Sequence, residues 1–430
     1  MNRLFCKALC VCIIASLSHV NANAQHANTF FTVPGLNEYC KINPDGKSVL
    51  PSGRYVSPAG KTIRITHDPF GMAVSPDGKT AITLHNGVVT LINLASMGTT
   101  RIPSYDGKIK SPLSNGSFLG VAFHPTLPNV YVSGGDNGAV IVYDYKNLKT
   151  IDSISLNGTI DGKTFEDSFT SDLLFHEGSN ELLVLDRGNF RMVRIDVSTR
   201  KLKASIPTGR QPFGLAISPD GKTALVANVG MYDYKLVEGS TQENANSQMI
   251  SRHPYGDNTP ASRNGVVMEG KKIPAVGDPN STEGMSVFVI NLTNNTVTHK
   301  LKTGLLIGEM VEDAQVTGGA SPNSIVVGSR YAYVTNATND NIAIIDYRKG
   351  KVQGRIPIKV DKRIDNIRGL LPFGICMSKD EKTLYTALLG FNAVAVIDIA
   401  TQKTTGLIPT GWGPARVLLS RDAKEMYIIS

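Results

Sequence analysis

Short apolar runs separated by polar turns recur along the chain from about residue 69 onward. In the first copy, Phe70 to Val74 precedes the turn Ser75-Pro76-Asp77-Gly78, and a second apolar run follows it. Proline presets such a turn, aspartate bonds back to the backbone, and glycine accepts a positive φ. Each copy therefore predicts two antiparallel strands joined by a tight turn.

This pattern occurs seven times. Three copies begin with Pro-Phe-Gly, at residues 69, 212 and 372, and weaker copies occupy 119–134, 171–186, 322–336 and 413–429. Most copies continue into a third and a fourth apolar run, so that four strands fill each forty to fifty residues. That spacing is typical of a β-propeller blade. The sequence predicts an all-β fold, a seven-bladed β-propeller of four-stranded antiparallel blades.

The seventh copy is incomplete, because only two of its strands precede Ser430. Residues 48–53 and 55–66 resemble a third and a fourth strand that lead into the first Pro-Phe-Gly motif. We expect the ring to close by pairing of these N-terminal strands with the C-terminal blade, since closure removes exposed strand edges.

The first 24 residues have the features of a signal peptide. Arg3 and Lys7 precede an apolar stretch over 8–17 that is too short to span a bilayer, and Ala22-Asn23-Ala24 offers a cleavage site. No later run is long and apolar enough to cross a membrane. We expect an exported protein, periplasmic or secreted, in which residues 25–430 form one propeller domain; a lipid anchor fits the cysteine context poorly.

Composition and charge narrow the function classes only slightly. The 41% apolar residues exclude wholesale disorder. Loss of Arg3 and Lys7 with the signal lowers the net charge from +8 to +6, and no dense Lys/Arg run is present, so nucleic-acid binding is weakly supported. Only Cys40 and Cys376 remain after the signal. An exported protein could join them in a disulfide, but the repeat does not bring them together, so we expect two free, partly buried thiols.

Four residues of the fifth copy carry a family resemblance. Tyr333-Val334-Thr335-Asn336 spells the YVTN repeat, and with the seven copies in phase, residues 36–430 resemble the YncE-like seven-bladed propellers. Residues 226–239 and 273–292 are similar to the propeller half of bacterial proteins that fuse such a propeller to an alkaline-phosphatase-type phosphoesterase. This resemblance implies phosphoesterase association, whereas the metal ligands and nucleophile of the catalytic half match no residue of this chain.

An insertion of about 231–284 interrupts the fourth copy. It has no sustained apolar periodicity and is rich in Asn, Ser, Gly and Pro. Long loops in compact folds are usually functional or mobile. One hypothesis is a lid over one propeller face, which presents Tyr232, Tyr234, His253 and Tyr255 to a ligand or partner; the alternative is a loop packed on the blade rim.

The sequence contains no convincing catalytic pattern. The histidines form no HxH or HExxH pair, and no G-x-S-x-G is present, so we predict no catalytic residue, no metal site and no cofactor. His124 and His176 occupy the serine position of the repeat turn, which favours a role in the turn over metal ligation.

Propellers usually bind ligands where the loops that enter the innermost strands meet around the central channel. Several cations and aromatic residues there suit an anionic or planar ligand. The phenylalanines of the Pro-Phe-Gly motifs are expected to pack between blades instead. The candidate ligand-binding residues are His67, Asp68, Asp172, Arg210, Asn323, Arg368, Trp412 and Arg416.

Three functional hypotheses remain open. The favoured one is a monomeric binding module for a small anionic ligand or a protein partner, which includes a role as the accessory half of a phosphoesterase system, with no enzymatic activity on this chain alone. The second is a propeller hydrolase, of lactonase type or phosphoesterase-associated, with a cation in the channel. The third is binding of single-stranded DNA.

Overall fold

The computed structural model describes residues 32–43, 46–113, 116–241, 244, 258–311, 313–361, 363 and 367–430. The predicted signal peptide, residues 1–24, lies outside this part of the chain. The chain divides into two compact units, one up to Tyr55 and one from Val56 onward. Within the described residues, no helix has the length and apolarity needed to cross a membrane.

The first unit is a small hairpin-like segment. Its strand β1 (Ser48–Val49) pairs with β2 (Tyr55–Val56), and Lys41 forms an isolated bridge with Val49. The Tyr55 hydroxyl donates to the Glu38 carboxylate, and Lys41 and Lys47 lie 3.3 and 3.8 Å from it. The Tyr55 hydrogen bond, followed by the two lysines, lowers the pKa of Glu38.

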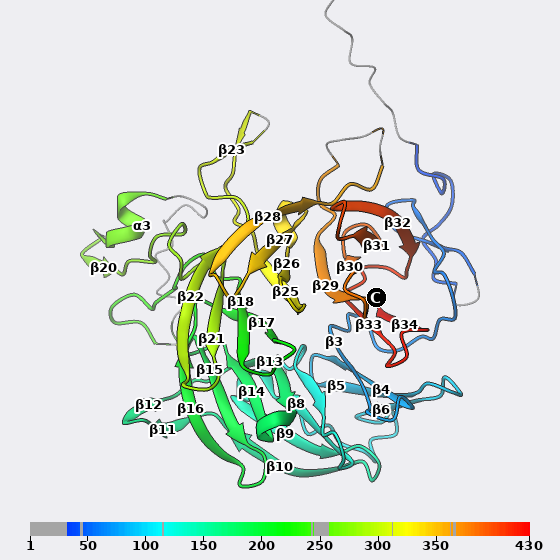
Figure 1. Cartoon of the computed structure of the whole chain (residues 1–430), viewed down its shortest axis with the longest axis horizontal. Helices are drawn as coiled ribbons and strands as arrows, with labels where there is room; N and C mark the ends of the chain where they lie inside the picture. Colours follow the sequence, from blue (N-terminus) through cyan, green and yellow to red (C-terminus); the bar gives the residue numbers. More distant parts are fainter. Residues whose placement is uncertain are drawn as a thin grey trace, which may run out of the picture. The chain divides into compact units, whose positions relative to one another are not determined.

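The second unit contains six four-stranded antiparallel sheets, the blades of a β-propeller (Figure 1). The chain fills each blade from the centre outward, in the strand order 1-2-3-4. Their strands are, in blade 1, β3 (Gly71–Val74), β4 (Thr80–His85), β5 (Val88–Asn93) and β6 (Thr99–Ile102); in blade 2, β7 (Val121–Phe123), β8 (Asn129–Ser133), β9 (Ala139–Asp144) and β10 (Lys149–Ser155); in blade 3, β13 (Thr170–His176), β14 (Glu181–Asp186), β15 (Arg191–Asp196) and β16 (Lys201–Pro207); in blade 4, β17 (Pro212–Ile217), β18 (Thr223–Asn228), β21 (Ser286–Asn291) and β22 (Thr296–Lys302); in blade 5, β25 (Pro322–Val327), β26 (Ala332–Asn336), β27 (Asn341–Asp346) and β28 (Lys351–Pro357); in blade 6, β29 (Pro372–Met377), β30 (Thr383–Leu388), β31 (Ala393–Asp398) and β32 (Lys403–Pro409).

Seven inner strands nevertheless form a ring. The seventh repeat contributes only the hairpin of β33 (Arg416–Leu419) and β34 (Met426–Ile429). Successive inner strands touch around the circle, and β33 contacts both β29 and β3, which closes it. The propeller thus has six complete blades and a two-stranded seventh position.

The predictions of seven four-stranded blades and of N-terminal closure are therefore wrong for the described strands. Strand β1 pairs with β2, and β33 pairs with β34, so the N-terminal strands do not extend the C-terminal sheet. Ser57-Pro58-Ala59-Gly60 interrupts the segment that was expected to pair, since proline lacks an N–H and glycine weakens a strand. The Ala59 N–H donates instead to the carbonyl of Pro409, the last residue of β32.

The repeat turn has the chemistry that its sequence predicts. In blade 1 the Ser75 hydroxyl donates to Asp77 (2.6 Å) and accepts from the Thr80 N–H, while Asp77 accepts from the Lys79 N–H. Gly78 adopts φ +70°, as the turn requires. The same serine–aspartate bond, which lowers the pKa of the aspartate, recurs at 218–220, 378–380 and 420–422.

Adjacent blades pack face to face through apolar side chains. Between blades 3 and 4, for example, Leu183, Leu185 and Met192 meet Leu215 and Val226, and all five are buried. Strands covered on both faces account for the nearly continuous apolar runs in the sequence.

The two cysteines among the described residues give a first prediction. Both are free; Cys40 is exposed, and burial raises the pKa of the Cys376 thiol to about 12. At pH 8 only about one Cys376 in ten thousand is then a thiolate, the reactive form. We expect iodoacetamide to add once to the native chain 25–430 and twice in urea, measured by intact mass. Two additions at similar rates without urea would contradict the burial of the Cys376 thiol.

Candidate functional site

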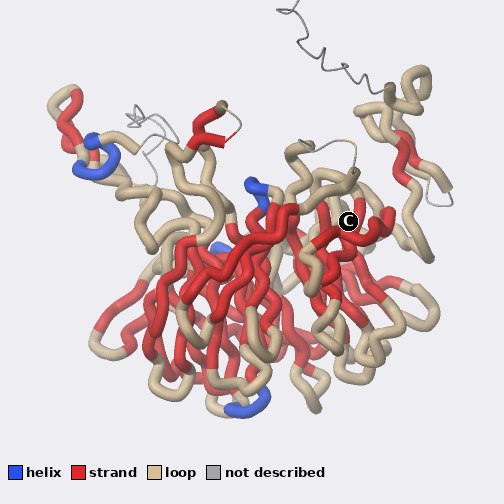
Figure 2. The backbone as a smooth tube through the Cα atoms, turned by 45° about the horizontal axis from the view of Figure 1, so that its top comes forward, coloured by secondary structure: helices blue, strands red, loops and turns tan. Residues whose placement is uncertain are grey.

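One end of the blades carries nearly all of the added structure. We call it the loop face: it is the end at which the inner strands begin and the second strands end. The hairpin β11 (Gly158–Ile160)–β12 (Lys163–Phe165), the insertion with α3 (Pro260–Asn264), β19 (Val266–Met268) and β20 (Lys271–Ile273), and the hairpin β23 (Met310–Val311)–β24 (Ala314–Gln315) all lie in connections at this end. Figure 2 shows the part of the insertion with α3, and the β23–β24 hairpin, projecting from one side of the strands. The 3₁₀ turns at 135–137 and 337–339 also follow second strands at this end, whereas the one at 177–179 lies at the other end.

Four phenylalanines meet at the centre of the loop face. Ring centroids lie 6.1 Å apart for Phe70 and Phe118, 5.9 Å for Phe118 and Phe213, 5.9 Å for Phe213 and Phe373, and 5.8 Å for Phe373 and Phe70. These residues belong to blades 1, 2, 4 and 6, and most of the contacts join blades that are not neighbours. Such contacts exist only across the centre of the ring, so the prediction that these phenylalanines pack between blades is wrong.

Asp172 and Arg416 also meet across the centre, from blade 3 and the seventh repeat. An Arg416 Nη2 lies 4.0 Å from Asp172 Oδ1. Asp172 is buried and accepts from the backbone N–H groups of Leu173 and Leu215. Burial raises the pKa of this carboxyl, and Arg416 and the two N–H groups oppose that shift.

Asn323, from blade 5, is buried and already bonded within the ring. Its amide donates to the carbonyls of Ser321 and Pro372 and accepts from the Thr335 hydroxyl. Asn323 thus links the inner strands of blades 5 and 6, and its polar atoms are engaged there.

The remaining predicted residues of the inner loops lie at the surface. His67 and Asp68 are 3.1 Å apart and more than three-quarters exposed, with His67 against the ring of His85. Arg368 is exposed, and Trp412 is 61% exposed. Of the eight predicted residues, the structure brings together Asp172 with Arg416 and His67 with Asp68.

Arg210 anchors the insertion. Its Nη1 donates to the carbonyls of Met231 (2.7 Å) and Asp278 (2.9 Å). The nearby Lys302 ammonium donates to three further carbonyls of the insertion, those of Pro279, Ser281 and Gly284. Burial, and then the charge of Arg210, lower the pKa of Lys302 to about 8. Two cations therefore fix both ends of the insertion to blade 4.

The predicted lid residues separate into two groups. Tyr232 is buried and Tyr234 is 63% exposed, with 6.1 Å between their ring centroids. His253 and Tyr255 lie outside the described residues. Tyr232 thus belongs to the packed base of the insertion, and Tyr234 is exposed at its surface.

Arg187 is a functional candidate that was not predicted. It follows β14, in the turn to the third strand of blade 3, and its guanidinium carbon lies 5.5 Å from the ring centroid of Phe169 and 5.9 Å from that of Phe213. Its Nε and Nη2 both donate to the Gln211 amide oxygen, at 3.1 and 2.9 Å. Burial lowers the pKa of the guanidinium. Aligning the repeats would have revealed it, since the residue after the second strand is Asn86, Gly134, Val229, Ala337 or Leu389 in the other blades.

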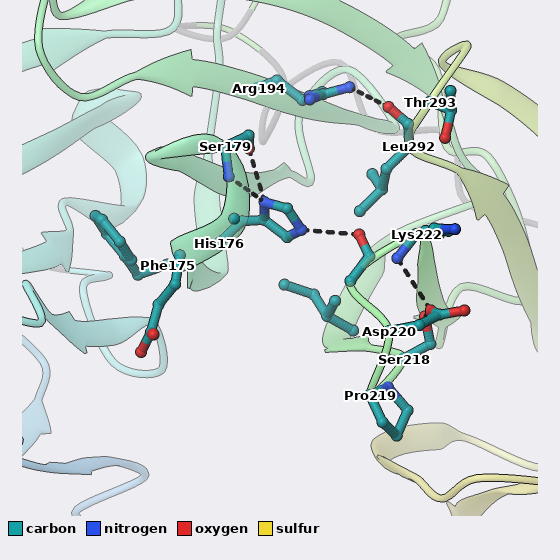
Figure 3. A pocket seen from close by; sticks show the side chains of 14 residues that line it. Phe175, His176, Ser179, Arg194, Ser218, Pro219, Asp220, Lys222, Leu292 and Thr293 are labelled. Atoms are coloured by element: carbon teal, nitrogen blue, oxygen red, sulfur yellow. Dashed lines mark hydrogen bonds between the residues drawn. The ribbon is translucent and has the colours of Figure 1, made fainter.

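A cavity of about 610 Å³ lies between blades 3 and 4 at the opposite end from the loop face (Figure 3). His176 accepts from the Ser179 N–H through Nδ1, so its Nε2 donates to the Gly221 carbonyl, 2.8 Å away. Arg194 is paired with Glu181 and donates to the Leu292 carbonyl. These groups already bond one another across the two blades, so the cavity is a structural junction and a weaker candidate than the loop face.

Histidines 124 and 176 fit the predicted role in the turn. His124 accepts from the N–H groups of Thr126 and Leu127, as His176 does from Ser179. Among the described residues, no three His, Cys, Asp or Glu side chains gather in a way that could hold a metal ion.

Comparisons with known proteins support the fold alone. No family model matches the chain, and no curated protein matches it. Among solved structures, hydrazine synthase of Kuenenia stuttgartiensis is similar with a TM-score of 0.55 and 18% identity, over 86% of this chain and 98% of that one. A functionally unknown protein from Desulfotomaculum acetoxidans is similar with a TM-score of 0.51 and 14% identity, over 87% of this chain and 94% of that one.

Proposed function

We propose that this chain is an exported YVTN-type propeller of the YncE-like kind, which acts as a binding module through its loop face. The YVTN sequence of β26 and the seven in-phase repeats support the family, and the closed ring of seven inner strands is consistent with it. The N-terminal signal pattern supports export to the periplasm or the medium.

One observation carries the proposal of a binding face. The added hairpins and the insertion emerge at the same end of the blades as the central phenylalanines and Arg187. Loops held by a rigid scaffold are where proteins place binding residues. The opposite end consists largely of repeat turns whose polar groups bond within the turn, as at Ser75 and Ser218.

We further propose that the chain serves as the accessory half of a phosphoesterase system. Support comes from the resemblance of residues 226–239 and 273–292, which begin and end the insertion. Arg210 holds both ends to blade 4 and Lys302 holds the second end, so the insertion has a fixed base from which to contact a ligand or partner beside the centre of the loop face.

The test is a binding screen with mapping. Phosphate, pyrophosphate, citrate, benzoate, naphthyl phosphate and a single-stranded oligothymidylate are added to chain 25–430, and the melting temperature and amide hydrogen exchange are recorded. We expect a small anion to raise the melting temperature and to slow exchange at 66–70, 187–190 and 210–213. Stabilisation by none of these probes, or protection confined to 75–80 and 218–223, would overturn the proposal. Protection of the loop face by the oligonucleotide alone would favour the DNA-binding alternative.

A further inference from the structure

Arg187 has an unused hydrogen-bonding edge. A guanidinium carries five N–H donors. The Gln211 amide oxygen takes the Nε donor and one Nη2 donor, which together form one edge of the group. Among the described residues, no acceptor is bonded to the other edge, formed by Nη1 and the second Nη2 hydrogen. That edge has the geometry that binds a carboxylate or a phosphate with two parallel hydrogen bonds.

Arg187 also differs from three other partly or fully buried cations of blades 3 and 4. Arg191 is paired with Asp186, Arg194 with Glu181, and Lys302 is surrounded by three carbonyls. For Arg187, no carboxylate in the described part of the chain lies within ion-pair distance, and its partner Gln211 is neutral. Removing a cation from water costs free energy unless an anion or several dipoles compensate. An anionic ligand would supply the missing charge.

The apolar surroundings of Arg187 restrict what carries the anion. Phe169 and Phe213 flank the guanidinium, and Phe213 continues into the central cluster with Phe118 and Phe373. All four of these phenylalanines are partly exposed. Aromatic rings pack well against planar apolar groups, in stacked or edge-on geometry.

We propose that Arg187 binds the carboxylate or phosphate group of a planar, apolar ligand whose body lies on the central phenylalanines. This inference rests on the proposed function, because it assigns a ligand class to the same loop face. The guanidinium supplies two charge-assisted hydrogen bonds, Gln211 holds its orientation, and the phenylalanines select an aromatic body over a small hydrophilic anion.

The experiment uses matched probes and matched variants of chain 25–430. The probes are 2-naphthoate, 2-naphthyl phosphate, the uncharged 2-naphthamide and acetate, titrated by calorimetry and by the fluorescence of Trp412, the single tryptophan of the sequence. The variants are Arg187→Gln and Arg187→Lys. The control is Arg330→Gln, since Arg330 is exposed, stacks on Tyr331 4.8 Å away and lies in the turn between the first two strands of blade 5, at the other end of the blades.

We expect 2-naphthoate and 2-naphthyl phosphate to bind better than acetate and naphthamide. The difference in affinity between the two naphthyl anions identifies whether a carboxylate or a phosphate is preferred. Arg187→Gln should weaken the preferred anion about tenfold to a hundredfold, Arg187→Lys less, and Arg330→Gln not at all. Unchanged affinity in a folded Arg187→Gln variant would overturn this inference and leave the proposed function standing. Failure of both anions to bind the wild type would also overturn it. Should Arg187→Gln not fold, equal binding of naphthoate and naphthamide by the wild type would refute it.

Discussion

Replacing Asp186 with alanine is expected to lower the free energy of unfolding by about 3–5 kcal/mol, the largest effect we expect from a charged residue of this protein. Asp186 and Arg191 are almost completely buried, and their side chains form an ion pair of 2.8 Å. Removal of the carboxylate leaves the Arg191 charge inside the blade without compensation. The midpoint of urea unfolding, followed by circular dichroism and Trp412 fluorescence, measures the change.

The size of this effect follows from how completely the pair is bonded. Asp186 also accepts from the Ser168 hydroxyl, the Phe169 N–H and Asn189. Arg191 also donates to the Leu156 carbonyl in the chain between blades 2 and 3, and its guanidinium lies 3.6 Å from the ring centroid of Phe165 in β12. The ion pair therefore joins the loop that enters the inner strand of blade 3 to the β11–β12 hairpin. Because Phe169 flanks Arg187, loss of Asp186 should also disturb the loop face.

A double-mutant cycle separates the pair from its surroundings. The variants are Asp186→Ala, Arg191→Met and the double change. We expect the double variant to be no less stable than Asp186→Ala, because it removes the uncompensated cation. Asp152→Ala is the control, since Asp152 and Arg200 form an exposed ion pair of 2.6 Å. The free energy of unfolding of this variant should lie within about 0.5 kcal/mol of the wild-type value. Additive single effects would contradict a coupled pair.

The local chemistry of the fold was predictable from the sequence because it depends on neighbouring residues. Ser75 and Asp77 bond within one turn, and the same four residues in order therefore specify the same hairpin at 218 and nearly the same at 378. The completion of the seventh repeat depends on pairing between distant segments. Apolar alternation at 55–66 resembles a strand, yet it does not determine which edge that segment joins.

The candidate site was predicted in part for the same reason. The repeat placed Asp172 and Arg416 in the inner loops, and they do meet. Arg210 has the same predicted position, but its partners are carbonyls of an insertion whose path the sequence does not specify. Arg187 lies in a second-strand turn, outside the inner loops to which the prediction was confined. Arg187 is a candidate because its guanidinium lies beside Phe213, which comes from the next blade.

Replacing Gly214 with alanine is expected to destabilise the propeller by at least about 3 kcal/mol, at or beyond the upper end of ordinary overpacking. A β-carbon at Gly214 would lie 2.0 Å from the backbone oxygen of Asn323 in the next blade. That oxygen belongs to a strand held in the ring on both sides, so it cannot move away as a flexible side chain would. The urea midpoint should fall sharply, with reduced yield of folded protein.

Gly354→Ala provides the matched control. Gly354 lies in β28, the outer strand of blade 5, where an added β-carbon meets nothing within 4 Å. Alanine there should leave stability unchanged or raise it by about 0.4–1 kcal/mol, since the unfolded chain loses freedom. Equal midpoints for the two alanine variants would mean that the inner strands of blades 4 and 5 are not in this close contact.

The same position explains both the recurrence of glycine in the repeat and its exceptions. Gly71, Gly120 and Gly374 face the next inner strand as Gly214 does, with added β-carbons at 2.4, 2.4 and 2.7 Å from a backbone oxygen. Blade 3, blade 5 and the seventh repeat have Asp172, Ser324 and Arg416 there instead, and Asp172 and Arg416 reach each other across the centre. The glycine blades thus pack closely, and the polar side chains at the centre come from blades that lack this glycine. Because Asp172 accepts from the N–H of Leu215, the residue next to Gly214, the Gly214→Ala change should disturb the geometry around Asp172 as well as the stability of the ring.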